Sequence, residues 1–501
     1  MRPEDDEAQA SISGAARSHL TGVTRLTVVS QGLGASFAAV ALFGFFWMNF
    51  PASRASLPIY MLAVALLLAI AWQRGDAILA FLSRSHPVLP TLPPTVWFSG
   101  ALLLGVALRV VAATAFPAKL VSDDAHYLDL AHELANGLDY AAPEGRAYWP
   151  PGLPLVLAPL LPVFGTSAGL VYNVGTFALA EIATFMLGRL LAGWRVGCLA
   201  ALFLAVWPNF VFAAPLLQKE CLLIALWPAA AFFYLKAHQA ISEKKAGGHA
   251  LLAGGVVGYS VLTQPSSALL PLCLVLFSVL TAGWGRRTLI CVLAVSLGIV
   301  AVVTPWTVRN YAVLHRLTPI GTAGGLNFFM VTRPQSDGRW AELSARELQA
   351  LGSDEVVHSE RAFSLGIEAI REHPLHFLST VPRKPFYLFG QDIKNTYWTF
   401  ERGGVGTSVQ YATFYWLANG FYLVAIVLIS LFAMRKNYIH DTTPALILLW
   451  MFALYPILTQ SLFEASERHR YGALPIMALF AAMAFCWSAG SAGELGKQPI
   501  R

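Results

Sequence analysis

Long apolar segments recur along almost the whole chain and constrain its fold more than any other feature. A helix needs about 20 mainly apolar residues to cross the hydrocarbon core of a bilayer. Charged residues make up 12% of the 501 residues, whereas a soluble domain carries roughly 25%. We therefore predict an all-α polytopic membrane protein with about twelve transmembrane helices. The expected spans lie near residues 27–49, 58–72, 96–116, 168–190, 196–213, 220–236, 250–264, 266–283, 288–305, 413–433, 443–461 and 473–490.

The distribution of basic residues predicts how the chain is oriented across the membrane. Every short loop on one side carries a basic pair, and the corresponding tail is basic too. These residues are Arg74 and Arg84, Arg189 and Arg195, Lys244 and Lys245, Arg286 and Arg287, Arg435 and Lys436, and Lys497 and Arg501. Because cytoplasmic loops are enriched in Lys and Arg, we predict that both termini are cytoplasmic.

Two loops on the opposite side are long, at about residues 117–167 and 306–412, and are predicted to be external. The first contains an apolar but proline-broken stretch at 150–165, which we interpret as an interfacial or re-entrant piece. The second contains an amphipathic helical stretch at 355–371 that ends before a proline. Many transporters are built from internal repeats. No such repeat is visible in this sequence, which weakens a transporter interpretation.

Charge and cysteine usage exclude several other classes. No run of like charge is long enough to indicate nucleic-acid binding. All five cysteines lie in or beside apolar segments, without a disulfide framework or metal-ligand spacing. They are Cys198, Cys221, Cys273, Cys291 and Cys486. His126, His132, His373 and His376 fit no strong metal spacing either, so no metal site is predicted and no cofactor is expected.

The first long loop begins with the sequence VSDDAHYLDLAHELANG at 121–137, directly after an outward-going span. Ser122 suits an N-cap and Gly137 suits a C-terminal stop. Apolar positions between them recur at helical spacing. They are Tyr127, Leu130, Ala131 and Leu134. The segment therefore predicts a short helix along the outer membrane surface, with Asp123 and Asp124 in its first turn.

Two interpretations of this acidic pair remain open from the residues alone. Acidic side chains in the first turn of a helix commonly complement the helix dipole. Alternatively, a carboxylate near the bilayer, with its pKa shifted by partial desolvation and a like-charged neighbour, suits a general base.

Five motifs follow one another from this helix to the last span, and all fall on the predicted outer side. They are Asp123-Asp124 with Tyr127; Pro150-Pro151-Gly152 with Pro154 and Phe164-Gly165; Gln218-Lys219-Glu220; Thr304-Pro305-Trp306-Thr307-Val308-Arg309-Asn310-Tyr311 with Gly324-Gly325-Leu326-Asn327; and Glu467-Arg468-His469-Arg470-Tyr471 with Pro475. In this order they resemble the GT-C glycosyltransferases, most closely the branch of protein O-mannosyltransferases and aminoarabinose transferases. The resemblance covers about residues 96–490.

This resemblance implies an inverting hexosyl- or pentosyltransferase on the exoplasmic face of a bacterial inner membrane. The donor would be a polyprenyl-phosphate sugar, and the acceptor a hydroxyl of a glycan, a lipid or a protein. Asp123 matches the family's catalytic carboxylate, which would take the acceptor's proton. Asp124 stands where relatives often have glutamate, and Glu220 matches a second external carboxylate. Tyr127 matches a residue near the lipid phosphate.

Trp149 marks a departure from the aminoarabinose branch, whose members place a lysine directly before the proline pair. The donor phosphate would then be bound by other cations, such as Arg146, Lys219, Arg309 or Arg470. Asn310 and Glu467 complete the predicted substrate-binding set. Several of these residues also suit ordinary roles, because Lys, Arg and Trp commonly anchor span ends at the interface.

The predicted organisation has three parts: a cytoplasmic tail with two extra spans at 1–95, the GT-C-like module at 96–490 and a cytoplasmic tail at 491–501. Glu181 lies inside a span, where a charge is costly, so we expect it to pair with a buried polar group or to line a cavity.

Two rival functions remain: a transporter or flippase of a lipid-linked sugar, and a non-catalytic envelope-assembly protein.

Overall fold

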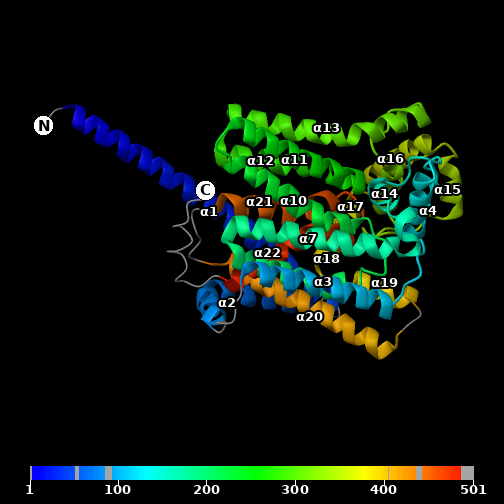
Figure 1. Cartoon of the computed structure of the whole chain (residues 1–501), viewed down its shortest axis with the longest axis horizontal. Helices are drawn as coiled ribbons and strands as arrows, with labels where there is room; N and C mark the ends of the chain where they lie inside the picture. The colour runs from blue at the N-terminus through cyan, green and yellow to red at the C-terminus, as the bar shows by residue number, and fades with distance from the viewer. Residues whose placement is uncertain (1–2, 51–55, 85–92, 404–405, 436–442, 487–501) are drawn as a thin grey trace.

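The computed structural model describes residues 3–50, 56–84, 93–403, 406–435 and 443–486. Long helices lie side by side, and the two long connections gather at one end of the bundle, which we call the loop end (Figure 1). The long helices are α1 (Pro3–Asn49), α2 (Ser56–Arg84), α3 (Pro94–Ala115), α7 (Ala168–Ala192), α8 (Trp194–Ala205), α10 (Glu220–Gln239), α11 (Glu243–Thr263), α12 (Leu270–Ala282), α13 (Arg286–Leu314), α20 (Ser408–Ala433), α21 (Thr443–Gln460) and α22 (Leu474–Cys486).

The prediction of an all-α polytopic membrane protein is confirmed for the described residues, whose only β-type pairing is an isolated bridge between Ala142 and Gly145. Nine helical segments there are long and apolar enough to cross a membrane. The predicted count of twelve is not reached by this measure, because α8 and α21 are short and α11 is not among the nine. Helix α1 begins at Pro3, well ahead of the predicted start of the first span.

Parts of the predicted topology lie outside the described residues, namely Lys436, Lys497, Arg501, the side chain of Arg84 and the tail at 491–501. The cytoplasmic placement of both termini stays a prediction. The two loops predicted to share one side do meet at the loop end, where the amide of Arg146 donates to the Glu355 carboxylate at 2.9 Å.

Short helices make up most of the loop end. The first connection contains α4 (Asp123–Ala135), α5 (Gly152–Leu157) and α6 (Leu161–Phe164). The second contains α14 (Ala323–Thr332), α15 (Ala345–Leu351), α16 (Glu355–Glu372), α17 (Pro374–Thr380), α18 (Lys384–Phe389) and α19 (Lys394–Gly403). Helix α9 (Pro208–Val211) and the 3-10 helix η5 (Glu467–Ala473) adjoin them. The predicted helices at 121–137 and 355–371 correspond to α4 and α16.

Close helix packing depends on small residues. A Cβ atom on Gly254 of α11 would lie 2.2 Å from the Val295 carbonyl oxygen of α13, and one on Gly298 would lie 2.3 Å from the Leu251 oxygen. Small residues let helix backbones approach in this way inside membranes. Helix α7 turns directly into α8 at Gly193, whose φ of 87° favours glycine.

Glu181 of α7 pairs with Arg109 of α3 at 3.5 Å, and both side chains are 1% exposed. Arg109 also donates to the backbone oxygens of Gly105, Leu204 and Ala205. The expectation that Glu181 pairs with a buried polar group is therefore confirmed. This ion pair joins three helices within the bundle.

Candidate active site

Helix α4 presents the predicted catalytic pair from its first turn. Ser122 occupies the N-cap position, as predicted, with φ of 56°. Its side chain accepts no backbone hydrogen bond, and its hydroxyl lies 3.4 Å from Asp123 Oδ1. Tyr127, Leu130 and Ala131 are buried, and they fix the face of α4 that packs into the protein.

Asp123 is the more accessible carboxylate of the pair, with 34% of its side chain exposed. Its Oδ2 accepts a hydrogen bond from Arg468 Nη1 at 2.9 Å. Burial disfavours its ionised form, but the cations of Arg468 and Lys219 outweigh this effect and hold the pKa of Asp123 below its usual value. Asp123 is therefore a carboxylate at neutral pH.

Asp124 has a different environment. Only 3% of its side chain is exposed, and Arg402 Nη1 of α19 lies 2.6 Å from its Oδ2. Burial raises the pKa of Asp124 to about 7, although Arg402 opposes this shift. Asp124 thus ties α4 to α19, whereas Asp123 faces the more open side.

Arg468 joins three carboxylates from distant parts of the chain. Besides Asp123, its Nε lies 3.7 Å from Glu220 Oε1 and its Nη2 lies 3.9 Å from Glu464 Oε2. We call Asp123, Lys219, Glu220, Glu464 and Arg468 the outer charge cluster. The structure therefore brings the predicted catalytic residues Asp123 and Glu220 together around a guanidinium.

Lys219 is the second cation of this cluster. Its Nζ lies 5.7 Å from the centre of the Tyr127 ring, in cation–π range. Burial lowers the pKa of Lys219, and Glu220 opposes this effect. Among the described residues, no carboxylate oxygen lies within 4 Å of Lys219 Nζ. Lys219 is therefore free to neutralise an anionic ligand.

Aromatic rings border the outer charge cluster. Trp398 of α19 lies under three cations: Lys394 at 4.6 Å, Arg402 at 4.8 Å and Arg468 at 5.7 Å from its ring. Residues 394, 398 and 402 share one face of α19, because positions four apart are neighbours on a helix. This spacing is visible in the sequence, but their place beside Asp123 and Arg468 is shown only by the structure.

Trp149, which directly precedes the proline pair at 150–151, lies beside Tyr127. Their ring centres are 5.3 Å apart, and the His126 ring stacks on Trp149 at 5.2 Å. The indole nitrogen donates to Glu144 Oε2 at 3.1 Å. His126, Tyr127 and Trp149 therefore form an aromatic surface at this position.

Arg309 and Asn310, at the end of α13, contact loop backbone. Arg309 donates to the carbonyl oxygens of Arg146 at 2.6 Å and Tyr140 at 3.0 Å. Asn310 is buried and donates to Thr318 and Ile320. No described hydrogen bond or ion pair joins either side chain to the outer charge cluster. Their predicted substrate roles stay predictions.

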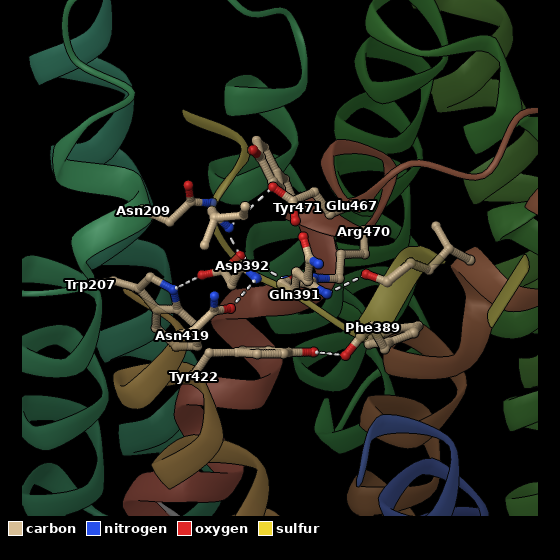
Figure 2. A network of polar contacts seen from close by, with 12 residues as sticks. Trp207, Asn209, Phe389, Gln391, Asp392, Asn419, Tyr422, Glu467, Arg470 and Tyr471 are labelled. Atoms are coloured by element: carbon tan, nitrogen blue, oxygen red, sulfur yellow. Dashed lines mark hydrogen bonds and ion pairs between the residues drawn. The ribbon is translucent and has the colours of Figure 1, made fainter. Parts of the chain in front are cut away.

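Glu467 and Arg470 lie deeper, in a separate set of contacts (Figure 2). Arg470 pairs with Asp392 at 2.7 Å, and both side chains are fully buried. Glu467 Oε1 accepts from the Ile393 amide at 3.2 Å. The motif pointed to Glu467 and Arg470 as substrate contacts, yet Arg468 is the residue of η5 that reaches Asp123. Asp392 and Arg402 were not singled out from the sequence.

No group of three or more His, Cys, Asp and Glu residues in the described part of the chain has an arrangement suited to a metal ion. The site offers carboxylates, the unpaired ammonium group of Lys219 and the faces of aromatic rings. Such a set can bind a phosphate and a sugar and can accept a proton from a hydroxyl.

Sequence comparison is consistent with this chemistry. Residues 149–308 match the family model described as dolichyl-phosphate-mannose-protein mannosyltransferase. The resemblance to protein O-mannosyltransferases is therefore confirmed for this part of the chain. The match includes Trp149, Lys219 and Glu220, while Asp123 and η5 lie outside it. No curated protein sequence matches the chain.

Several solved structures are similar to this chain at low identity. The apo oligosaccharyltransferase of Archaeoglobus fulgidus aligns at 13% identity and a TM-score of 0.48, over 80% of this chain and 51% of that one. This chain thus spans about half the length of the archaeal protein. Apo ArnT from Cupriavidus metallidurans aligns at 16% identity and a TM-score of 0.38, over 78% of each chain. The S. cerevisiae Pmt1-Pmt2 complex aligns at 16% identity and 0.36, over 51% of this chain and 38% of that one.

Proposed function

We propose that this protein transfers a sugar from a polyprenyl-phosphate donor to an acceptor hydroxyl, on the exoplasmic face of a bacterial inner membrane. One observation carries the proposal: Asp123, ionised and partly exposed, lies in one cluster with the unpaired ammonium of Lys219. A base and a phosphate-binding cation are the two groups that this transfer requires.

In the proposed reaction, Asp123 takes the proton of the acceptor hydroxyl while its oxygen attacks the anomeric carbon. The bond between that carbon and the phosphate oxygen breaks, its electron pair leaves with the polyprenyl phosphate, and the anomeric configuration inverts. Lys219 neutralises the departing phosphate, as charge-assisted contacts do efficiently in a partly desolvated site. Arg468 orients Asp123, and Glu220 orients a hydroxyl of the sugar or the acceptor.

The residues inside the bundle favour this proposal over a transporter. A transporter needs polar residues near the middle of several spans. The pair of Arg109 and Glu181 lies within spans, but the two terminal nitrogens of Arg109 are occupied by Glu181 and three backbone oxygens. The more exposed charges of the candidate site lie at the loop end.

The proposal is tested in two stages. Mass spectrometry of envelope glycans and lipids from a deletion strain identifies the missing sugar and its acceptor. Purified protein is then assayed for transfer from the matching polyprenyl-phosphate sugar. If the deletion strain lacks no sugar and the protein moves a lipid-linked sugar across a vesicle membrane, the transporter alternative is correct instead.

The proposed orientation has an independent test. A cysteine at Ser353, which is exposed in the second long loop, is expected to react in intact cells with an impermeant thiol reagent. Labelling that requires permeabilised cells would place this loop, and the proposed site, in the cytoplasm.

A further inference from the structure

Asp392 is the centre of a buried polar network (Figure 2). Its carboxylate accepts hydrogen bonds from Arg470 at 2.7 Å, from Asn209 at 3.1 Å and from the indole nitrogen of Trp207. Arg470 also donates to the carbonyl oxygens of Leu388 and Gln391. Every polar contact of Asp392 is thus made away from solvent.

Asn209 extends this network to α19. While its Nδ2 donates to Asp392, its Oδ1 accepts from the backbone amide of Asn395 at 2.9 Å. The first turn of a helix has unsatisfied amides. Asn209, a residue distant in sequence, satisfies one of them and fixes where α19 begins.

Asn395 connects α19 to the start of α10. Its Oδ1 accepts from Gln218 Nε2 at 2.7 Å and from the Tyr471 hydroxyl at 3.1 Å. Gln218 directly precedes Lys219 and Glu220 in the chain. We call Trp207, Asn209, Asp392, Asn395 and Arg470 the buried network.

Each arm of the buried network ends close in sequence to a residue of the site. Gln218 leads to Lys219 and Glu220, Arg470 lies two residues after Arg468, and α19 carries Trp398 and Arg402. The buried pair of Arg109 and Glu181 provides a contrast, because its other contacts are backbone oxygens of α3 and α8. Both ion pairs are buried, but only the pair of Asp392 and Arg470 links segments that carry residues of the site.

We infer that Asp392 and Arg470, through Asn209 and Asn395, are positioning residues of the proposed glycosyltransferase. They set the start of α10, helix α19 and η5 relative to one another, so that Lys219, Trp398 and Arg468 face one ligand. This inference rests on the proposed function. Binding constellations depend on being held within roughly 0.5 Å of their productive geometry.

Hydrogen–deuterium exchange of the full-length protein in nanodiscs tests the linkage without a ligand. D392N is compared with E181Q, which disrupts the other buried ion pair. In D392N, exchange is expected to rise together in segments 216–222, 392–403 and 464–471. In E181Q, these segments are expected to keep the wild-type exchange. A rise confined to 388–396 in D392N, or the same three-segment rise in E181Q, would overturn the inference.

Binding of undecaprenyl phosphate, measured by native mass spectrometry per folded molecule, tests the consequence for the site. D392N is expected to lose affinity by about tenfold or more, since the weakening of a contact to a charged phosphate lowers affinity by a factor of this size. E181Q is expected to bind as the wild type does, whatever its thermal stability. Unchanged affinity in folded D392N contradicts the inference.

N209A keeps the test decisive if D392N does not fold. This neutral change removes the cap of α19 and leaves the ion pair of Asp392 and Arg470 intact. It is expected to raise exchange in 392–403 and to weaken binding of undecaprenyl phosphate; wild-type values for both would overturn the inference. A wild-type protein that does not bind undecaprenyl phosphate would sink the proposed donor, while the exchange experiment would still decide the positioning role.

Discussion

Arg468 and Arg470 lie two residues apart on η5, yet they belong to regions with opposite properties. In the outer charge cluster, Arg468 faces three carboxylates at 2.9, 3.7 and 3.9 Å, and 18% of its side chain is exposed. In the buried network, Arg470 is fully enclosed and pairs with Asp392 at 2.7 Å. The partly exposed contacts of Arg468 can be exchanged for contacts with a ligand. The fully buried contacts of Arg470 fix the framework that holds the outer charge cluster.

The largest expected effect is that of Asp123→Asn in the outer charge cluster. The amide keeps the shape of the side chain but cannot take a proton. Turnover is expected to fall by at least about two orders of magnitude, since a positioned base contributes about 10²–10⁴-fold. The assay measures sugar transfer per folded molecule.

The matched control is Asp129→Asn, the same change at an exposed position of α4, which is expected to leave turnover near the wild-type value. Asp124→Asn is expected to be milder than Asp123→Asn. Equal turnover of Asp123→Asn and the control would favour the helix-dipole explanation and the non-catalytic alternative.

Arg470→Gln addresses the buried network, where the expected loss is in stability. The change leaves the fully buried carboxylate of Asp392 without its cation, and removal of one partner of such a pair costs about 3–5 kcal/mol. Thermal unfolding in detergent measures the effect. Arg468→Gln is the control and is expected to lower the melting temperature much less. A reversed order of the two would break the distinction between the two regions.

Arg468→Gln should instead change the pH dependence of turnover. Arg468 is the main cation that lowers the pKa of Asp123, while burial raises it, so the pKa is expected to rise in the variant. Activity requires the carboxylate and is lost as the pH falls through this pKa. The acid limb of the turnover–pH profile is therefore expected to move to higher pH. An unmoved limb would show that Arg468 does not control the ionisation of Asp123.

The same depressed pKa links Asp123 to stability. Its ion pair contributes stability above the unfolded-state value of about 3.9, and this contribution is lost as the pH falls through the folded-state pKa. The difference in unfolding free energy between the wild type and Arg468→Gln, measured as a function of pH, reports this contribution independently of turnover.

The smallest expected effect is on donor binding in Lys219→Met. A hydrogen bond to a charged group is worth about 1.5–3 kcal/mol, so the donor KM is expected to rise about tenfold or more. Turnover at saturating donor should change little if the contact is the same in ground and transition states. Arg309→Ala is the comparison, because Arg309 contacts loop backbone instead. A larger rise in KM for Arg309→Ala would move the phosphate site away from Lys219.

The sequence predicted most of the helices because apolar length and helical spacing are local signals. Its motifs also singled out Asp123 and Glu220, both of which contact Arg468 in the structure. It could not separate Arg468 from Arg470, because the direction of side chains two residues apart depends on the 3-10 geometry of η5. Asp392 was missed because its partners Asn209 and Arg470 meet it only through tertiary packing, at separations of 183 and 78 residues.

The cap on α19 has a consequence for the biogenesis of the protein. Helix α19 has 10 residues, and isolated helices shorter than about 12–15 residues are marginally stable in water. The amide oxygen that caps its first turn belongs to Asn209, which reaches that place only after α8 and α9 have packed. The face that carries Trp398 and Arg402 is therefore completed late in assembly. A partly inserted chain would expose Asp123 without Arg402 and Trp398 in place, so the proposed transfer would require a complete membrane bundle.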